Sequence, residues 1–203
     1  MSIYQVSADI DDYRRITSPA YQVCPTICPP VLRAGRHNVG EFEGMGLRFL
    51  NVAIPQGTTI NAANLIITSS ENTNDACGTR ISAENVDNPA VFSVDDYAAA
   101  HARWVNRTVA RVDWDFTPFD VWILNAEYNS PDIAVVIQEI INRLGWVSGN
   151  AIAIFWNDWD WRTALNSHRP AYPHNIDANR AVKLDIDWET IPIVQTLPAT
   201  EIT

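Results

Sequence analysis

Lysine is almost absent from the sequence: Lys183 is the one lysine among 203 residues, beside thirteen arginines. Acidic residues outnumber basic residues by 24 to 14, and the formal net charge is −10. Binding to the phosphates of a nucleic acid needs a clustered basic surface, which an acidic chain opposes. We therefore expect no nucleic-acid partner.

The sequence also lacks a long apolar run. Nothing approaches the roughly 18 consecutive apolar residues of a membrane-spanning helix. The first nine residues, MSIYQVSAD, do not have the basic segment and following apolar segment of a signal peptide. We therefore expect no membrane partner, and a protein that is made in a cytoplasm without an export route.

Cysteine is scarce, and the three cysteines, an odd number, do not form a disulfide framework. Structural zinc takes four ligands, so Cys24, Cys28, Cys77 and His37 supply a Cys₃His set by count alone. Their spacing matches no known zinc knuckle, and we favour a proline-rich loop with two incidental thiols. A disulfide would need oxidising surroundings.

The sequence does contain a series of short strand signals, bounded by turn residues. Val182, Leu184 and Ile186 alternate with charged residues, which predicts a strand with one solvated face. The run at 151–156 is apolar throughout and predicts a strand that is covered on both faces. The expected strands are 47–52, 63–69, 79–84, 108–114, 151–156 and 182–188.

One amphipathic helix is expected at about 131–144. Ser130 is a suitable N-cap, Pro131 fits the first helical position, and apolar residues then recur at helical spacing until Gly145 supplies a stop. A second, weaker helix is expected over 93–103. Neither helix belongs to a repeating strand–helix–strand order, so the sequence does not indicate an α/β fold.

These signals predict an all-β fold, an antiparallel jelly-roll β-sandwich with one amphipathic helix and an extended N-terminal arm. Residues 1–45 are rich in proline and glycine and are expected to form the arm or long loops with one or two short strands. Residues 46–189 would form the sandwich domain. Residues 190–203 would form an extended C-terminal tail.

Two loops rich in carboxylate and amide oxygens follow predicted strands. The first contains Asp87 and Asn88, and the second contains Asp158 and Asp160. Calcium takes six to eight oxygen ligands from such loops, but Asp and Asn also form turns through bonds to the backbone. We favour turns, keep structural calcium at these four residues as the alternative, and expect no required cofactor.

Three tryptophans lie within six positions. Trp156 continues the inward-facing row of its strand, so we assign it to the core. Trp159 and Trp161 are followed by Arg162, and exposed aromatic residues with arginine are typical of protein interfaces. Exposed aromatic rings beside acids and amides also serve as stacking platforms for sugars, and we leave both interpretations open for these three residues.

No pattern of catalytic residues stands out. The sequence has no HExxH spacing, no nucleophile elbow and no glycine-rich phosphate loop. Paired acids such as Asp185 and Asp187 are typical of glycosidases, but these two fall on the outward face of an alternating strand, where charge is expected. We therefore expect no catalytic residues and no enzymatic activity.

Two stretches of the sequence resemble a domain found in phage virion proteins and in some bacterial surface proteins. The first contains IPQGTTI at 54–60, where that domain usually reads IPQGATI. The second contains SPDI at 130–133, IQEI at 137–140 and GWVSGN at 145–150, which look like its SPD, IQEI and GW.SGN segments. The resemblance covers about residues 46–189. It is similar to the jelly-roll sandwiches of carbohydrate-binding modules, including the group with a DNRLRE signature, which is absent here.

The resemblance implies a sandwich and a virion or cell-surface setting. We therefore expect a non-enzymatic virion structural protein, a capsid decoration or tail-associated component, assembled in the host cytoplasm and working through protein–protein contacts. Its partners would be further copies of itself, as a trimer, and a capsid or tail protein. The alternative is a carbohydrate-binding module that recognises host or environmental glycans.

Overall fold

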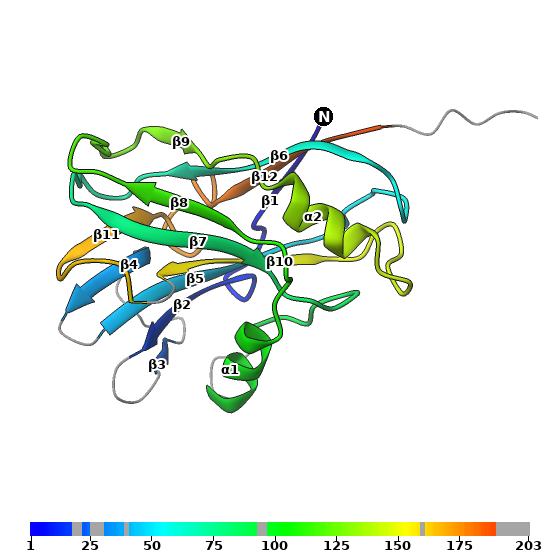
Figure 1. The fold of residues 1–203 in the computed structure, drawn as a ribbon, viewed down its shortest axis with the longest axis horizontal. Helices are drawn as coiled ribbons and strands as arrows, with labels where there is room; N and C mark the ends of the chain where they lie inside the picture. Colours follow the sequence, from blue (N-terminus) through cyan, green and yellow to red (C-terminus); the bar gives the residue numbers. More distant parts are fainter. Residues whose placement is uncertain (18–21, 25–30, 39–40, 93–96, 159–160, 190–203) are drawn as a thin grey trace, which may run out of the picture.

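Most of the regular structure in the described residues consists of short strands, with two short helices between them (Figure 1). The computed structural model describes residues 1–17, 22–24, 31–38, 41–92, 97–158 and 161–189. The strands are β1 (Ser2–Gln5), β2 (Asp12–Thr17), β3 (Gln22–Cys24), β4 (Leu32–Asn38), β5 (Glu41–Phe49), β6 (Ile60–Thr68), β7 (Cys77–Ala83), β8 (Val112–Phe116), β9 (Glu127–Asn129), β10 (Ile152–Asp158), β11 (Ser167–Ala171) and β12 (Lys183–Trp188). The helices are α1 (Tyr97–Val105) and α2 (Ala134–Ile141).

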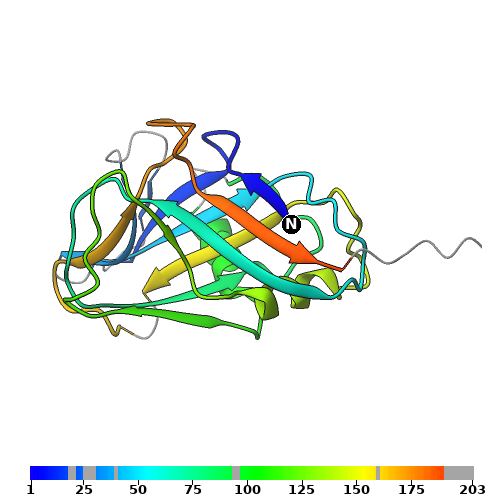
Figure 2. The same ribbon diagram turned by 90° about the horizontal axis from the view of Figure 1, so that it is seen from above.

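The strands form two antiparallel sheets that pack on one another (Figures 1 and 2). The smaller sheet has the order β1-β12-β6-β9. The larger sheet has the order β11-β4-β5-β10-β7-β8, and β2 and β3 are attached to it beside β5. The expected all-β antiparallel sandwich is confirmed.

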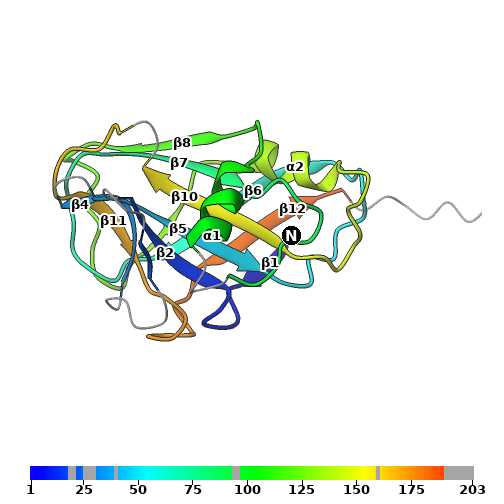
Figure 3. The same cartoon turned by 90° about the horizontal axis from the view of Figure 1, so that it is seen from below.

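The strand β10 is buried along its whole length. Ile154 and Trp156 belong to the main core between the sheets, whereas Ala153 and Phe155 belong to a second cluster on the outer face of the larger sheet. Trp104 of α1 packs against that second cluster, and Figure 3 shows α1 lying across this face. The expectation of a strand covered on both faces is confirmed.

The alternation predicted for β12 is also confirmed. Leu184 and Ile186 are fully buried in the main core, while Lys183 and Asp185 between and beside them are partly exposed. The strand pairs with β6 on one side and β1 on the other, so its backbone is used on both edges. Side chains that alternate between core and solvent are what an antiparallel sheet with one solvated face requires.

The helix expected at about 131–144 is confirmed as α2 but is shorter, and its predicted cap is wrong. Ile133 occupies the N-cap position without a side-chain bond. The Ser130 hydroxyl instead accepts the backbone N–H of Leu65 on β6 at 2.9 Å. Asp132 uses one oxygen to accept the N–H groups of Ala63 and Ala134, both at 2.9 Å. Ser130 and Asp132 therefore attach the start of α2 to β6, and Asp132 also accepts the N–H of the first residue of the helix.

The second predicted helix corresponds to α1, which begins at Tyr97 and ends at Val105. Its predicted start at Ser93 lies outside the described residues. The expectation of one helix in a β-sandwich therefore changes to two. None of the helices in the described part of the chain is long and apolar enough to cross a membrane.

The expected N-terminal arm over residues 1–45 is wrong where the structure describes it. The strand β1 pairs with β12, β2 pairs with β5, and β4 pairs with both β5 and β11. The proposed boundary at residue 45 also falls inside β5. Buried polar residues interrupt the alternation of apolar and polar residues that would predict these strands. Arg14 and Glu43 are both buried and form an ion pair with each other. The predicted tail, 190–203, lies outside the described residues.

If residues 1–45 are part of the sandwich, truncating a buried side chain there will destabilise the whole protein. Leu32 is buried in the main core, and Leu32→Ala is expected to lower the free energy of unfolding by about 2–5 kcal/mol. Ile3→Ala is the control, because the Ile3 side chain is 60% exposed. Urea denaturation of both variants measures the difference. If both variants lowered the free energy of unfolding by the same small amount, residues 1–45 would be an arm outside the sandwich.

Candidate functional site

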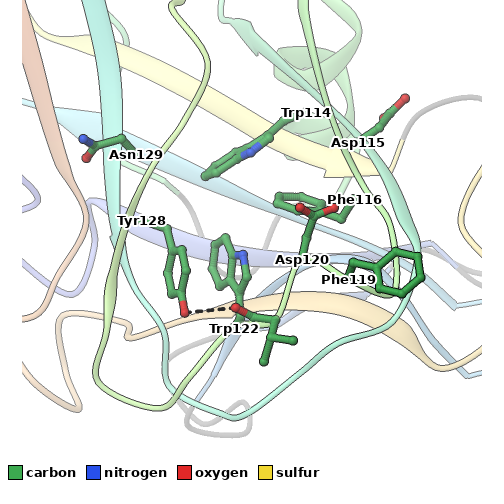
Figure 4. Close-up of a pocket in the computed structure, with 9 residues that line it drawn as sticks. Trp114, Asp115, Phe116, Phe119, Asp120, Trp122, Tyr128 and Asn129 are labelled. Carbon is green, nitrogen blue, oxygen red and sulfur yellow. Dashed lines mark hydrogen bonds between the residues drawn. The ribbon is translucent and has the colours of Figure 1, made fainter.

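An open pocket of about 370 Å³ lies where the edges of the two sheets meet. Strand β8 is the last strand of the larger sheet and β9 is the last strand of the smaller one, and residues 117–126 connect them. Figure 4 shows the side chains of the pocket. Its lining is Trp114, Asp115 and Phe116 from β8, Phe119, Asp120, Val121 and Trp122 from the connection, and Tyr128 and Asn129 from β9.

The inner wall of the pocket is a cluster of aromatic rings that continues into the core. The rings of Trp122 and Tyr128 are parallel, with their centroids 4.3 Å apart. Trp122 also packs on Trp114 at 5.7 Å, and Trp114 stacks on the fully buried Trp156 at 4.6 Å. Side chains packed in this way have little freedom to move, so the wall is rigid.

The connection between β8 and β9 is held in place by backbone bonds. Trp122 and Thr73 exchange two backbone hydrogen bonds, of 2.7 and 3.0 Å. The Leu124 N–H donates to the side chain of Asn72 at 2.8 Å. The Tyr128 hydroxyl accepts the Ile123 N–H at 2.7 Å and donates to the Val121 carbonyl at 3.2 Å, as the dashed line in Figure 4 shows for Val121.

Two carboxylates stand at the pocket, and each has partners. Asp115 accepts the Thr79 N–H at 3.1 Å with one oxygen and Arg162 at 2.9 Å with the other. Asp120 accepts the backbone N–H of Thr117 at 2.6 Å and its hydroxyl at 2.8 Å, both on Oδ2. These two bonds lower the pKa of Asp120 below its ordinary value, so its carboxylate is ionised near neutral pH.

A buried arginine lies behind the rings. Arg169 is fully buried, and its guanidinium carbon lies 4.4 Å from the centre of the Phe116 ring. It donates to the backbone carbonyls of Asp75 at 2.8 Å and Asp120 at 3.1 Å. Burial lowers the pKa of Arg169, and the negative charges of Asp75 and Asp120 oppose that effect. The Asp120 carboxylate therefore acts on Arg169 through space, while the hydrogen bond between the two residues uses the Asp120 backbone carbonyl.

The outer surface of the same connection is apolar. The side chain of Phe119 is 91% exposed and that of Ile123 is 58% exposed, and Val121 and Leu124 are exposed as well. We call residues 117–124 the apolar loop. Trp122 is the one buried residue of this loop, and the other seven are exposed.

The tryptophan segment singled out from the sequence lies beside this pocket, at the end of β10. Trp161 is 71% exposed and its ring meets Phe42 edge-on, with centroids 4.2 Å apart. Arg162 bonds to Asp115, which lines the pocket, and to the Thr79 carbonyl. Trp159 lies outside the described residues. The structure therefore brings Arg162 to the pocket, while Trp161 packs against β5.

The residues proposed for calcium lie in two separate loops, at opposite ends of β10. Asp87 pairs with Arg143, with 2.6 Å between Nε and Oδ1, and Asn88 accepts the N–H of Ala151 just before β10. Asp158, at the other end of β10, accepts the N–H groups of Arg162 and Thr163. Seven residues of strand separate the two loops by about 20 Å. Bonds from Asn88 and Asp158 to backbone N–H groups are what we expect if these residues form turns. Calcium binding stays a prediction.

Asp160 lies outside the described residues. Within the part of the chain that the structure describes, no group of three or more His, Cys, Asp or Glu side chains is placed to hold a metal ion. Cys77 is buried, and burial raises the pKa of its thiol to about 12, so this thiol is protonated at neutral pH. Cys28 lies outside the described residues.

The sequence interpretation missed the pocket itself. Phe119, Asp120 and Trp122 come from a segment, TPFDVWIL, that matches no strand or helix pattern. Its aromatic and branched residues between two turns were the signal available in the sequence. These residues form a site because β8 and β9, which belong to different sheets, lie side by side. The spacing of residues along the sequence does not predict that two such strands meet.

A second group of titratable residues lies away from the pocket, between the start of β2 and the loop after β11. Asp12 accepts the backbone N–H of His174 at 2.7 Å, and the His174 ring bonds to Asp9 at 2.6 Å. The neighbouring Asp11 is buried and paired with Arg48. Burial raises the pKa of Asp12 from 3.8 to about 7.

This raised pKa predicts how stability changes with pH. Between about pH 4 and 7 the folded protein keeps a proton on Asp12 that the unfolded chain has released, so this carboxyl lowers stability as pH rises through that window. Asp12→Asn, which keeps an oxygen for the His174 N–H, is expected to raise the urea midpoint more at pH 8 than at pH 5. Asp187→Asn, at a partly exposed carboxylate, is the control. A gain of equal size at both pH values would contradict this.

Comparisons with known proteins leave the chain without an assigned family. Neither models of protein families nor curated protein sequences give a match. The resemblance to domains of phage virion proteins therefore stays a prediction. The pocket and the apolar loop are the features of the described residues that bear on function.

Proposed function

We propose that the protein is a non-enzymatic virion structural protein, a capsid decoration or tail-associated component, that works through protein–protein contacts. The observation that carries this proposal is the apolar loop, which holds Phe119, Val121, Ile123 and Leu124 exposed within six positions. A contiguous group of exposed apolar side chains is typical of a surface that another protein covers.

The energetics of the loop favour such a contact. Removing a large apolar side chain from water contributes about 1.5–3 kcal/mol when burial is complete. The loop is already fixed by Trp122, Tyr128 and Asn72, so little conformational entropy is lost when a partner binds. A fixed apolar surface is therefore a stronger basis for binding than a flexible one of the same composition.

The partner that fits first is another copy of the chain, in the trimer expected from the sequence. Closed symmetric oligomers bring the same surface of each copy into equivalent contacts. A capsid or tail protein would be the further partner, and the virion, assembled in the host cytoplasm, would be the location. The resemblance of residues 46–189 to phage virion domains supports this setting.

The test is to make the apolar loop polar without touching the pocket. Ile123 and Leu124 do not line the pocket, so the double variant Ile123→Ser, Leu124→Ser is expected to reduce a trimer to a 22.7 kDa monomer in light scattering. Leu144→Ser is the matched control, because the Leu144 side chain is 98% exposed at the other end of the sandwich.

The same variants can be followed into particles. The loop variant is expected to be depleted at least about tenfold from purified virions, while the control is incorporated normally, since tenfold corresponds to about 1.4 kcal/mol of binding free energy. Wild-type protein that stays monomeric at every concentration and is absent from purified particles would refute the proposal.

A further inference from the structure

The pocket beside the apolar loop has a balanced charge. Of its two carboxylates, Asp115 pairs with Arg162, while Asp120 acts through space on the buried Arg169, whose guanidinium bonds to the Asp120 backbone carbonyl. Two arginines near two carboxylates leave the pocket with little net charge, so it attracts anions and cations only weakly. The protein as a whole has a net charge of −10, so the low net charge is a property of the pocket alone. It favours a ligand that is polar but uncharged.

The pocket nevertheless has hydrogen-bonding capacity. Asp120 uses Oδ2 for the two Thr117 bonds, and within the described residues no bond is recorded for Oδ1. Asn129 also lines the pocket, but its amide points away from Asp120 and Phe119, as Figure 4 shows. A ligand with several hydroxyl groups can donate one of them to Asp120 Oδ1, since a hydroxyl serves as both donor and acceptor.

The aromatic residues add apolar faces to this polar lining. Phe119 stands at the outer edge of the pocket, apart from the stacked Trp122 and Tyr128, as Figure 4 shows. The face of an aromatic ring carries partial negative charge and attracts the weakly positive C–H groups of a flat, polar ring. A pyranose has such C–H groups on its faces and hydroxyl groups around its rim.

We propose that the pocket between β8 and β9 binds a neutral saccharide, with Phe119 stacking on a sugar ring and Asp120 accepting a hydrogen bond from a hydroxyl group. Its volume of about 370 Å³ lies in the range of small-molecule sites. The stacked rings of Trp122 and Tyr128 hold the backbone beneath these two side chains, which limits the conformational freedom lost on binding.

This inference moves the glycan alternative from Trp159 and Trp161 to other residues. The exposed ring of Trp161 rests on Phe42 and does not line the pocket. The inference shares Phe119 with the proposed protein contact, but the two can be tested apart, because Ile123 and Leu124 lie outside the lining while Asp120 lies within it. The two proposals therefore fail or succeed in different variants.

The experiment is an NMR titration of the full chain that follows the indole N–H signals of Trp114 and Trp122. The probes are maltohexaose, cellohexaose, chitohexaose and mannohexaose, with N-acetylarginine amide and inorganic phosphate as charged probes. At least one hexasaccharide is expected to shift both signals to saturation, and the two charged probes are expected to leave them unchanged.

Variants then assign the site. Phe119→Ala and Asp120→Asn are each expected to weaken saccharide binding about tenfold, because the first removes the stacking contact and the second replaces an ionised acceptor with a neutral amide. Asn keeps an oxygen for Thr117, so Asp120→Asn should preserve the thermal unfolding midpoint. Trp161→Ala and Ile123→Ser are expected to bind as the wild type does.

Three results would overturn the inference. One is a flat titration with all four hexasaccharides. Another is a saturating shift produced by N-acetylarginine amide or phosphate in place of a saccharide. The third is loss of saccharide binding in Trp161→Ala with normal binding in Phe119→Ala. Loss of assembly in the Ile123 and Leu124 variant with normal saccharide binding would leave this inference intact and support the protein contact separately.

Discussion

The packing of rings around Trp156 is the interaction on which the site depends. Its indole N–H donates to the Thr79 hydroxyl at 2.7 Å, and that hydroxyl donates to the Trp114 carbonyl at 2.5 Å. The Trp156 ring also stacks on Trp114. These contacts fix β8 against β7 and β10. Trp114 also packs on Trp122, so the pocket wall is held by the same group of rings. The site is thus an outward extension of the core.

The parts of the fold that could be predicted are those in which each residue type has a single role. In β12 the apolar residues are buried and the charged ones are outside, and in β10 every side chain is buried, so simple patterns describe both strands. Residues 1–45 do not follow such a pattern, because β2 and β5 bury Arg14 and Glu43 as a pair. The pocket could not be predicted because it joins strands that are not neighbours in one sheet.

The imbalance between arginine and lysine acquires a structural explanation. Arg14, Arg15, Arg33 and Arg169 are buried in the described part of the chain. Arg169 lies on an aromatic ring and donates to backbone carbonyls, which the planar, weakly hydrated guanidinium does well and a compact ammonium group does poorly. These four residues therefore use arginine inside the fold.

The edge strands of the two sheets affect how copies of the protein can associate at high concentration. The outermost strands are short: β1 has four residues, β9 has three, and β8 and β11 have five each. Strand β11 also contains Pro170, which has no backbone N–H to offer a neighbouring chain. Such edges give a foreign strand little to pair with, which protects against fibre formation. Copies packed densely together would therefore meet through loops and side chains, and stay separate molecules rather than merge into one continuous sheet.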